Sequence, residues 1–196
     1  MTDGIRNRIL RAMDAFYIDD LEEALFQIAP AIDATAKKRY SRKKPGDRVR
    51  SFLKDEQDIL YGLSTQNRVN VEQSASVIYG EDGEFQSILY KFVRCAQAHD
   101  AELDTAKITL GGDFGIGRIL IKGASLNPSP GIVLVSRATV LALIFAVLCA
   151  AENSQLDLSD ITIPFLSEPS LELTPLVGNK AGFIEKYRTI FSQIKL

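Results

Sequence analysis

One arginine and one histidine in this sequence stand at a spacing that could support chemistry on a phosphodiester. Arg94 precedes His99 by five positions in the segment 90–100, and His99 is the single histidine of the chain. Imidazole can give or take a proton near neutral pH, and the forked guanidinium suits phosphate oxygens. RNA carries its own nucleophile in the 2′-OH, so its cleavage needs proton transfer and positive charge on the transition state, without a required metal. Arg94 and His99 are therefore predicted as a catalytic pair.

The spacing of this pair constrains how the two side chains can meet. Positions five apart differ by about 140° around an ideal helix, so Arg94 and His99 do not share one face. Two arrangements would bring them together: His99 at a frayed or turned helix end, or a dimer in which copies from two subunits meet across a two-fold axis. The second predicts a homodimer whose interface includes residues near 94–103. In the opposing interpretation Arg94 is solvated beside Asp100 or Glu102, and His99 stabilises a helix C-terminus.

Apolar spacing predicts the helices that must position this pair. Over residues 81–98, apolar side chains recur every three or four positions and form the stripe of an amphipathic helix that carries Arg94. An earlier helix begins after the capping residues Asp19 and Asp20 and continues toward Tyr40, with a kink expected where Pro30 interrupts it. Further helices are predicted over residues 47–60, 68–77 and 181–194.

The Arg94-x4-His99 motif and its helical context resemble the HEPN superfamily (higher eukaryotes and prokaryotes nucleotide-binding), whose hallmark is Arg-x4-6-His near a helix end. The resemblance covers about residues 15–105 and a later bundle helix. It implies a helical bundle and a metal-independent endoribonuclease of toxin or phage-defence type, with a composite active site at a homodimer interface. By this likeness Arg94 and His99 are the catalytic residues, and an antitoxin-like protein is an expected partner.

Cys95 departs from the pattern of active toxins of that superfamily, which commonly have Asn after the motif arginine. The departure favours the main alternative, a non-catalytic HEPN-like module that binds nucleotide, RNA or a partner protein. A third interpretation is a structural dimerisation protein in which His99 is incidental.

A strongly basic stretch from Lys37 to Arg50 follows the helix that ends near Tyr40. Only Asp47 opposes it locally, and Pro45-Gly46 places a turn inside it. Each phosphate that such a stretch neutralises releases counterions, so it is the candidate surface for contact with an RNA backbone. The alternative is a solvated loop. The predicted RNA-binding residues are Arg42, Lys43, Lys44, Arg48 and Arg50.

Other chemistries find little support in the residue types. One histidine, two separated cysteines and scattered carboxylates such as Asp55, Glu56 and Asp58 offer no recognisable metal-ligand spacing, so no metal and no cofactor are expected. The glycine-rich segment 111–117 lacks the G-x-G-x-x-G order of a phosphate cradle. It predicts a turn between strands over residues 107–110 and 118–122, and a further strand is expected over 132–135.

Composition places the chain among ordinary globular proteins. Its 196 residues suit a single domain, 46% of them are hydrophobic, and the formal net charge of −2 leaves nucleic-acid binding to a local patch. Two cysteines are too few for a disulfide framework, and the first residues lack the pattern of a secretory signal, so a cytoplasmic protein is expected. The uncharged segment 138–151 is shorter than the about 20 residues that span a bilayer, which predicts a buried core helix and no membrane association.

These observations predict one mainly α domain over residues 1–196. An HEPN-like helical bundle would comprise residues 15–105 and 136–151, with a small β-hairpin insertion after residue 105 in a β-containing segment over 106–135. A helix over 181–194 would follow. The intervening segment 152–180, which holds Pro164, Pro169 and Pro175, is expected to be irregular.

Overall fold

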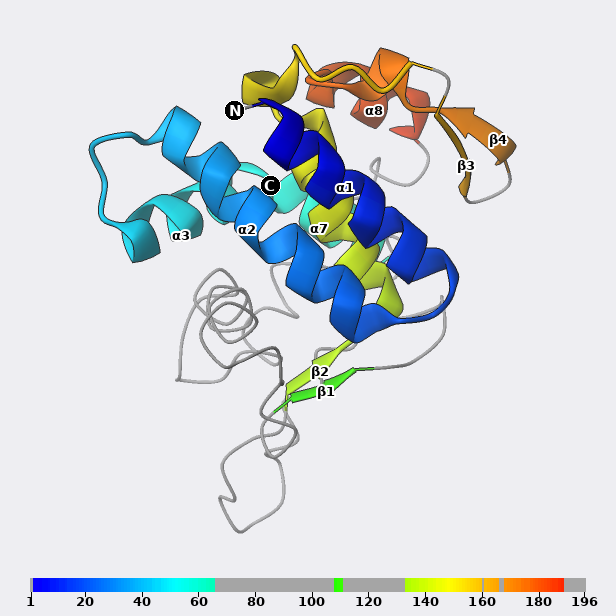
Figure 1. The fold of residues 1–196 in the computed structure, drawn as a ribbon, viewed down its shortest axis with the longest axis horizontal. Coiled ribbons are helices and arrows are strands. Elements are labelled where there is room, and N and C mark those ends of the chain that lie inside the picture. The colour runs from blue at the N-terminus through cyan, green and yellow to red at the C-terminus, as the bar shows by residue number, and fades with distance from the viewer. Residues whose placement is uncertain (1, 66–107, 111–132, 160, 166–167, 189–196) are drawn as a thin grey trace, which may run out of the picture.

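Two antiparallel helices form one layer of the molecule (Figure 1). The computed structural model describes residues 2–65, 108–110, 133–159, 161–165 and 168–188. α1 (Thr2–Tyr17) and α2 (Leu21–Arg39) pack along their length and are joined by a short turn in which Asp19 has a φ of 65°. Asp20 caps α2 as predicted, because its side chain accepts a hydrogen bond from the Glu23 backbone N–H at 3.0 Å.

α2 continues through Pro30 as one unbroken helix, and the kink that the sequence predicts at this residue stays a prediction. Proline removes one helical hydrogen bond, since it has no N–H to donate to the carbonyl of residue 26. Ile28 and Ile32 on either side of it are fully buried, and α2 packs both on α1 and on the apolar helix over residues 137–149. Burial of these side chains offsets the lost hydrogen bond.

The basic stretch leads into two helices where the sequence predicts one over residues 47–60. α3 (Pro45–Asp55) begins with a proline, whose missing N–H costs little because the first N–H groups of a helix have no helical partner. α4 (Gln57–Thr65) follows after Glu56, which belongs to neither helix. The Glu56 N–H still donates to the Phe52 carbonyl at 3.0 Å, but its side chain is buried and reaches distant residues. The side chain of Glu56 forms ion pairs with Arg39 and Lys180 at the place where α3 ends.

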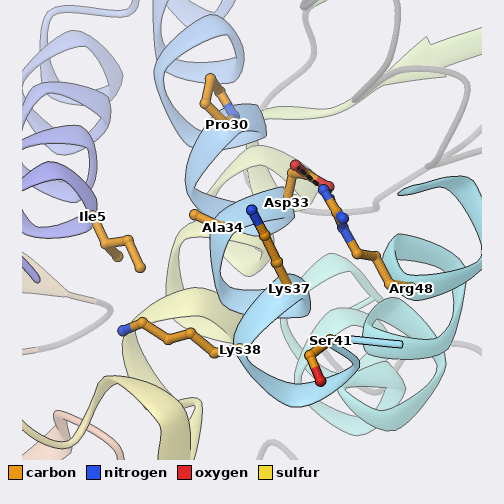
Figure 2. Close-up of a pocket in the computed structure, with 8 residues that line it drawn as sticks. All are labelled: Ile5, Pro30, Asp33, Ala34, Lys37, Lys38, Ser41 and Arg48. Carbon is orange, nitrogen blue, oxygen red and sulfur yellow. Dashed lines mark hydrogen bonds and ion pairs between the residues drawn. The ribbon is translucent and has the colours of Figure 1, made fainter. Parts of the chain in front are cut away.

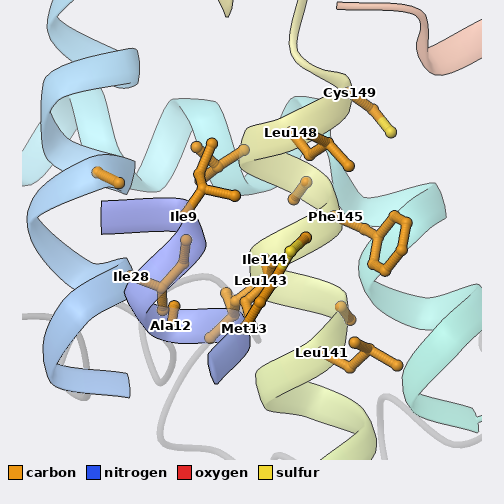
Figure 3. Packing of buried hydrophobic residues seen from close by; sticks show 14 of the residues in the cluster. Ile9, Ala12, Met13, Ile28, Leu141, Leu143, Ile144, Phe145, Leu148 and Cys149 are labelled. Atoms are coloured by element: carbon orange, nitrogen blue, oxygen red, sulfur yellow. The ribbon is translucent and has the colours of Figure 1, made fainter. Parts of the chain in front are cut away.

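The centre of the molecule is the apolar helix α7 (Arg137–Cys149). Ser136 caps it by accepting a hydrogen bond from the Thr139 N–H, and all residues over 138–149 are buried. α1, α2 and α4 pack against α7, and Figure 3 shows its side chains facing Ile9 of α1 and Ile28 of α2. The prediction of a buried core helix is confirmed. Among the described helices, none combines the length and the apolar character needed to cross a bilayer.

A short parallel pair of strands precedes α7. β1 (Ile108–Leu110) pairs with β2 (Val133–Val135), with Ile108 opposite Val133. Both strands lie where the sequence predicts them. The predicted hairpin partner of β1, residues 118–122, lies outside the described residues, as do the glycine turn over 111–117 and the helices predicted over 68–77 and 81–98.

An antiparallel hairpin occupies part of the segment that the sequence predicts as irregular. β3 (Thr162–Phe165) pairs with β4 (Glu168–Glu172). Pro164 and Pro169 argue against strands at this place, but a two-stranded hairpin consists of edge strands, which tolerate proline. The predicted fold class, mainly α with a small β-hairpin after residue 105, is confirmed, although the hairpin described here lies later in the chain than expected.

An aromatic cluster attaches the C-terminal elements to α7. These elements are η2 (Ala151–Asn153) and η3 (Thr174–Leu176), which are 3-10 helices, and α8 (Lys180–Lys186). Phe145 of α7 stacks on Phe183 of α8 with ring centroids 4.9 Å apart, and Phe165 and Tyr187 complete the cluster. This packing holds the start of α8 in place, so that Lys180 reaches the carbonyl of Asp55, the last residue of α3.

Candidate functional site

The structure locates one of the two predicted functional groups of residues. Arg94 and His99 lie outside the described residues, together with Cys95 and the predicted dimer interface near 94–103. The basic stretch is described in full: it covers the C-terminal end of α2, the loop after it and the first two turns of α3 (Figure 1). The candidate site therefore comprises these basic residues and the side chains that surround them.

Three predicted RNA-binding residues are exposed on the loop between α2 and α3. These loop cations are Arg42, Lys43 and Lys44. Lys43 Nζ donates to Ser51 Oγ at 2.7 Å and lies 4.2 Å from the centre of the Tyr40 ring, and neither contact cancels its charge. Within the described part of the chain, Arg42 and Lys44 form no ion pair. All three can offer their charge to an anion.

The other two predicted RNA-binding residues share their charge with carboxylates. Arg48 forms a forked pair with Asp33 of α2, with Nε to Oδ1 2.9 Å and Nη2 to Oδ2 2.6 Å. The hydrogen bonds to Asp33 raise the pKa of the Arg48 guanidinium. Arg50 Nη2 lies 2.6 Å from Asp47 Oδ1, one turn earlier on α3. A phosphate would have to exchange with these carboxylates to bind either arginine.

Arg39, at the end of α2, points into the molecule. Its guanidinium forms a forked pair with Glu152 of η2, in which both N–O distances are 2.8 Å. The guanidinium also reaches Glu56 Oε1 at 2.7 Å and Asp55 Oδ2 at 3.1 Å. Its Cζ lies 4.9 Å from the centre of the Phe52 ring. Burial alone would raise the pKa of Glu152, but hydrogen bonds from Arg39 and the positive charge of Arg39 outweigh it and lower that pKa.

Lys180, at the start of α8, is the second cation of the same cluster. Its Nζ donates to the Asp55 carbonyl oxygen at 2.5 Å and lies 2.7 Å from Asp58 Oδ1. It also lies 3.2 Å from Glu56 Oε2, a buried oxygen that receives no hydrogen bond from the described residues. The positive charge of Lys180 attracts this carboxylate oxygen. We call Arg39, Lys180, Asp55, Glu56, Asp58 and Glu152 the Arg39 cluster.

The Arg39 cluster contains two cations and four carboxylates, which leaves an excess of negative charge. It joins the end of α2 to α3, α4, η2 and α8. Because its arginine is already held by three carboxylates and its net charge repels phosphate, the Arg39 cluster does not extend the RNA-binding surface. Its role is to hold five elements together.

A hollow of about 650 Å³ opens between α1, α2 and α3 beside the basic stretch (Figure 2). Most of its lining comes from one face of α2, where the helical period brings Pro30, Ala34 and Lys37 into line, and Ser41 follows just beyond the end of α2. Ile5 of α1 adds an apolar side chain. The sequence prediction missed this hollow, and the signal that points to it is the spacing of four and three residues between Pro30, Ala34 and Lys37 along α2.

Two lysines give this hollow a positive rim. Lys38 Nζ donates to the Glu152 carbonyl oxygen and to Asn153 Oδ1, each at 3.1 Å, and both acceptors are neutral. Lys37 is exposed and has no ion-pair partner among the described residues. The pair of Arg48 and Asp33 also lines the hollow, as Figure 2 shows. An apolar floor beneath uncompensated positive charge suits an organic anion.

The described residues contain no group of three or more His, Cys, Asp or Glu side chains placed to hold a metal ion. Cys149 is a free thiol buried at the end of α7, and burial raises the pKa of this thiol. A protonated, buried thiol is a poor nucleophile. Among the described residues, the groups that remain available to bind a ligand are therefore the cations of the basic stretch.

Comparison with known proteins matches the sequence of the chain to one family model. A family model described as Rv1289 matches residues 4–191, a range that includes the basic stretch, the hollow and positions 94 and 99. No curated protein and no solved structure matches the chain.

Proposed function

The chain belongs to the Rv1289 family, and we propose that it is a metal-independent endoribonuclease of HEPN type. The single observation that carries the proposal is the Arg94-x4-His99 motif, which contains the one histidine of the chain. The mainly helical fold supports it, since the resemblance implies a helical bundle. The exposed loop cations support it further, because a polynucleotide substrate needs a positively charged surface.

Arg94 and His99 have separate roles in this reaction. The 2′-oxygen attacks the adjacent phosphorus, the bond from phosphorus to the 5′-oxygen breaks, the 2′-OH proton passes to a base, and the 5′-oxygen receives a proton from an acid. A single imidazole cannot be base and acid in the same step, so a homodimer that brings two copies of His99 together is part of the proposal. Arg94 stabilises the charge on the non-bridging phosphate oxygens.

The loop cations hold the RNA backbone near this site. Arg42, Lys43 and Lys44 are exposed, and each phosphate that they neutralise releases counterions. Arg48 and Arg50 join them when phosphate replaces Asp33 and Asp47 as their partners. The reaction takes place in the cytoplasm. Similar enzymes act as toxins or in phage defence, so the proposal includes an antitoxin-like protein that binds and blocks the site.

A second function, binding without cleavage, is favoured by Cys95 at the position that is commonly Asn in active toxins of the superfamily. The loop cations serve this function equally well, because they bind phosphate and take no part in proton transfer. The bound partner would then be a nucleotide, an RNA or a protein.

Wild-type protein in EDTA should cleave single-stranded RNA and leave DNA of the same sequence intact, because DNA lacks the 2′-OH that attacks. Denaturing gels of the two labelled strands measure both rates, and parallel reactions with added Mg²⁺ show whether a metal is needed. Cleavage of both strands, or cleavage only with Mg²⁺, would contradict the proposal.

RNA that is retained but not cleaved would support the second function instead. In that case a variant with Arg42, Lys43 and Lys44 all replaced by serine should lose the retained RNA in a mobility-shift assay. Lys54→Ser, which removes an exposed cation from α3, is the control for general loss of charge.

A further inference from the structure

We infer that the hollow beside α2 is a nucleotide subsite, which binds one nucleotide of a single-stranded RNA with its base on the apolar floor and its phosphate at Lys37 and Lys38. The choice of RNA as the source of this nucleotide rests on the proposed function. The subsite itself rests on the shape, lining and charge of the hollow.

The floor of the hollow suits the flat face of a base. Ile5, Pro30 and Ala34 present apolar surface from α1 and α2, and the volume of about 650 Å³ lies within the range of small-molecule sites. The side of the hollow carries Asp33, whose two oxygens each accept one hydrogen bond from Arg48. A carboxylate oxygen can accept more than one hydrogen bond, so Asp33 can also accept from an amino group on the base edge.

The rim of the hollow suits a phosphate. Lys37 is exposed and lacks an ion-pair partner among the described residues, while the contacts of Lys38 with neutral oxygens hold its ammonium group without cancelling its charge. Lys37 and Lys38 each bring a positive charge to the lining of the hollow, and both charges attract a phosphate. The Ser41 hydroxyl, two residues beyond the end of α2, adds a neutral donor.

The lining favours a nucleotide within a strand over a free phosphate ion. Inorganic phosphate would use the two lysines and leave the apolar floor in contact with water, so it would gain only part of the binding energy. Ser41 at the edge of the hollow is followed directly by the loop cations Arg42, Lys43 and Lys44. A strand that leaves the hollow on this side therefore meets further positive charge for its next phosphates.

Binding of a fluorescently labelled short single-stranded RNA, measured by anisotropy in EDTA, tests this subsite. The His99→Ala chain is used throughout, so that the RNA stays intact. Lys37→Glu and Ala34→Trp, which fills the floor, should each weaken binding by about tenfold or more. Lys54→Glu is the matched control, because it makes the same charge change at an exposed position of α3 outside the hollow, and it should weaken binding by less than about threefold.

Equal losses in Lys37→Glu and Lys54→Glu would overturn the subsite, since they would show only an effect of overall charge. Competition separates the two sources of phosphate: AMP should displace the RNA at concentrations at which inorganic phosphate does not, and equal potency would overturn the role of the floor. Circular dichroism tests whether the Ala34→Trp variant is folded. If it is not, the Lys37→Glu comparison and the competition still decide.

The outcomes for the subsite and for the proposed function are distinguishable. A selective loss in Lys37→Glu, in a protein whose wild type does not cleave RNA, would keep the subsite and refute the nuclease. Cleavage by the wild type, with no selective loss in Lys37→Glu, would keep the nuclease and refute the subsite.

Discussion

Replacing His99 by alanine should lower the rate of RNA cleavage in EDTA by about 10²–10⁴-fold, the range expected when a general acid or base is lost. His99 is the only imidazole of the chain, so no other histidine of the same subunit can take over the proton transfer. Arg94→Ala should lower the rate by about 10²–10³-fold, because the charge on the phosphate oxygens then lacks its preorganised donor. Rates at saturating enzyme concentration isolate this effect from RNA binding.

Arg188→Ala is the control for these two variants. Arg188 is exposed two residues after the end of α8 and pairs with Glu185. Its loss should leave both the cleavage rate and the melting temperature almost unchanged. Unchanged cleavage by both His99→Ala and Arg94→Ala would remove the assignment of this pair, whatever the rate of the wild type.

Replacing Arg39 by methionine should lower the free energy of unfolding by about 3 kcal/mol, as for other buried ion pairs that lose one partner. Glu56 is 2% exposed, and its Oε1 would lose the guanidinium at 2.7 Å. Glu152 would lose both bonds of its forked pair, and Lys180 would be the remaining cation of the Arg39 cluster. Urea unfolding of wild type and variant near neutral pH measures the difference.

The same comparison has a predicted dependence on pH. The pKa of Glu152 is lowered from its ordinary value of 4.5 in the folded chain, so its contribution to stability is complete above that value and is lost as the pH falls through the lowered pKa. The difference between wild type and Arg39→Met should therefore narrow below about pH 4.5.

Two further variants establish the cause of the Arg39 effect. Arg188→Met removes an exposed ion pair by the same substitution and should cost less than about 1 kcal/mol. The double variant Arg39→Met with Glu56→Gln should recover part of the loss, because it removes the buried charge that Arg39 compensates. Similar small losses in Arg39→Met and Arg188→Met would contradict a structural role for the Arg39 cluster.

Local patterns in the sequence were sufficient for the elements whose cause is local. Asp20 and the apolar spacing after it predict the start of α2, and an uncharged apolar segment predicts α7 as a buried helix. The loop with Arg42, Lys43 and Lys44 follows in the same way, but its end does not: the sequence predicts a turn at Pro45-Gly46, whereas these two residues form the start of α3. In each case the signal and the structure that it predicts lie within a few residues of one another.

Elements that depend on distant residues were not predictable in this way. Glu56, which lies between α3 and α4, forms ion pairs with Arg39 and Lys180, and Glu152 meets Arg39 across 113 positions of the chain. The hairpin of β3 and β4 contains prolines, which in a single sequence argue against strands. The pairing of Arg48 with Asp33 depends on how α3 packs on α2, so the residue type alone could not show that its charge is shared.

The chemical nature of the ends left on RNA that wild-type protein cleaves in EDTA tests the central claim most directly. Attack by the 2′-oxygen breaks the bond to the 5′-oxygen, so mass spectrometry should find a 2′,3′-cyclic phosphate on one fragment and a 5′-hydroxyl on the other. Fragments that carry a 3′-hydroxyl and a 5′-phosphate, which attack by water at the same phosphorus produces, would contradict it.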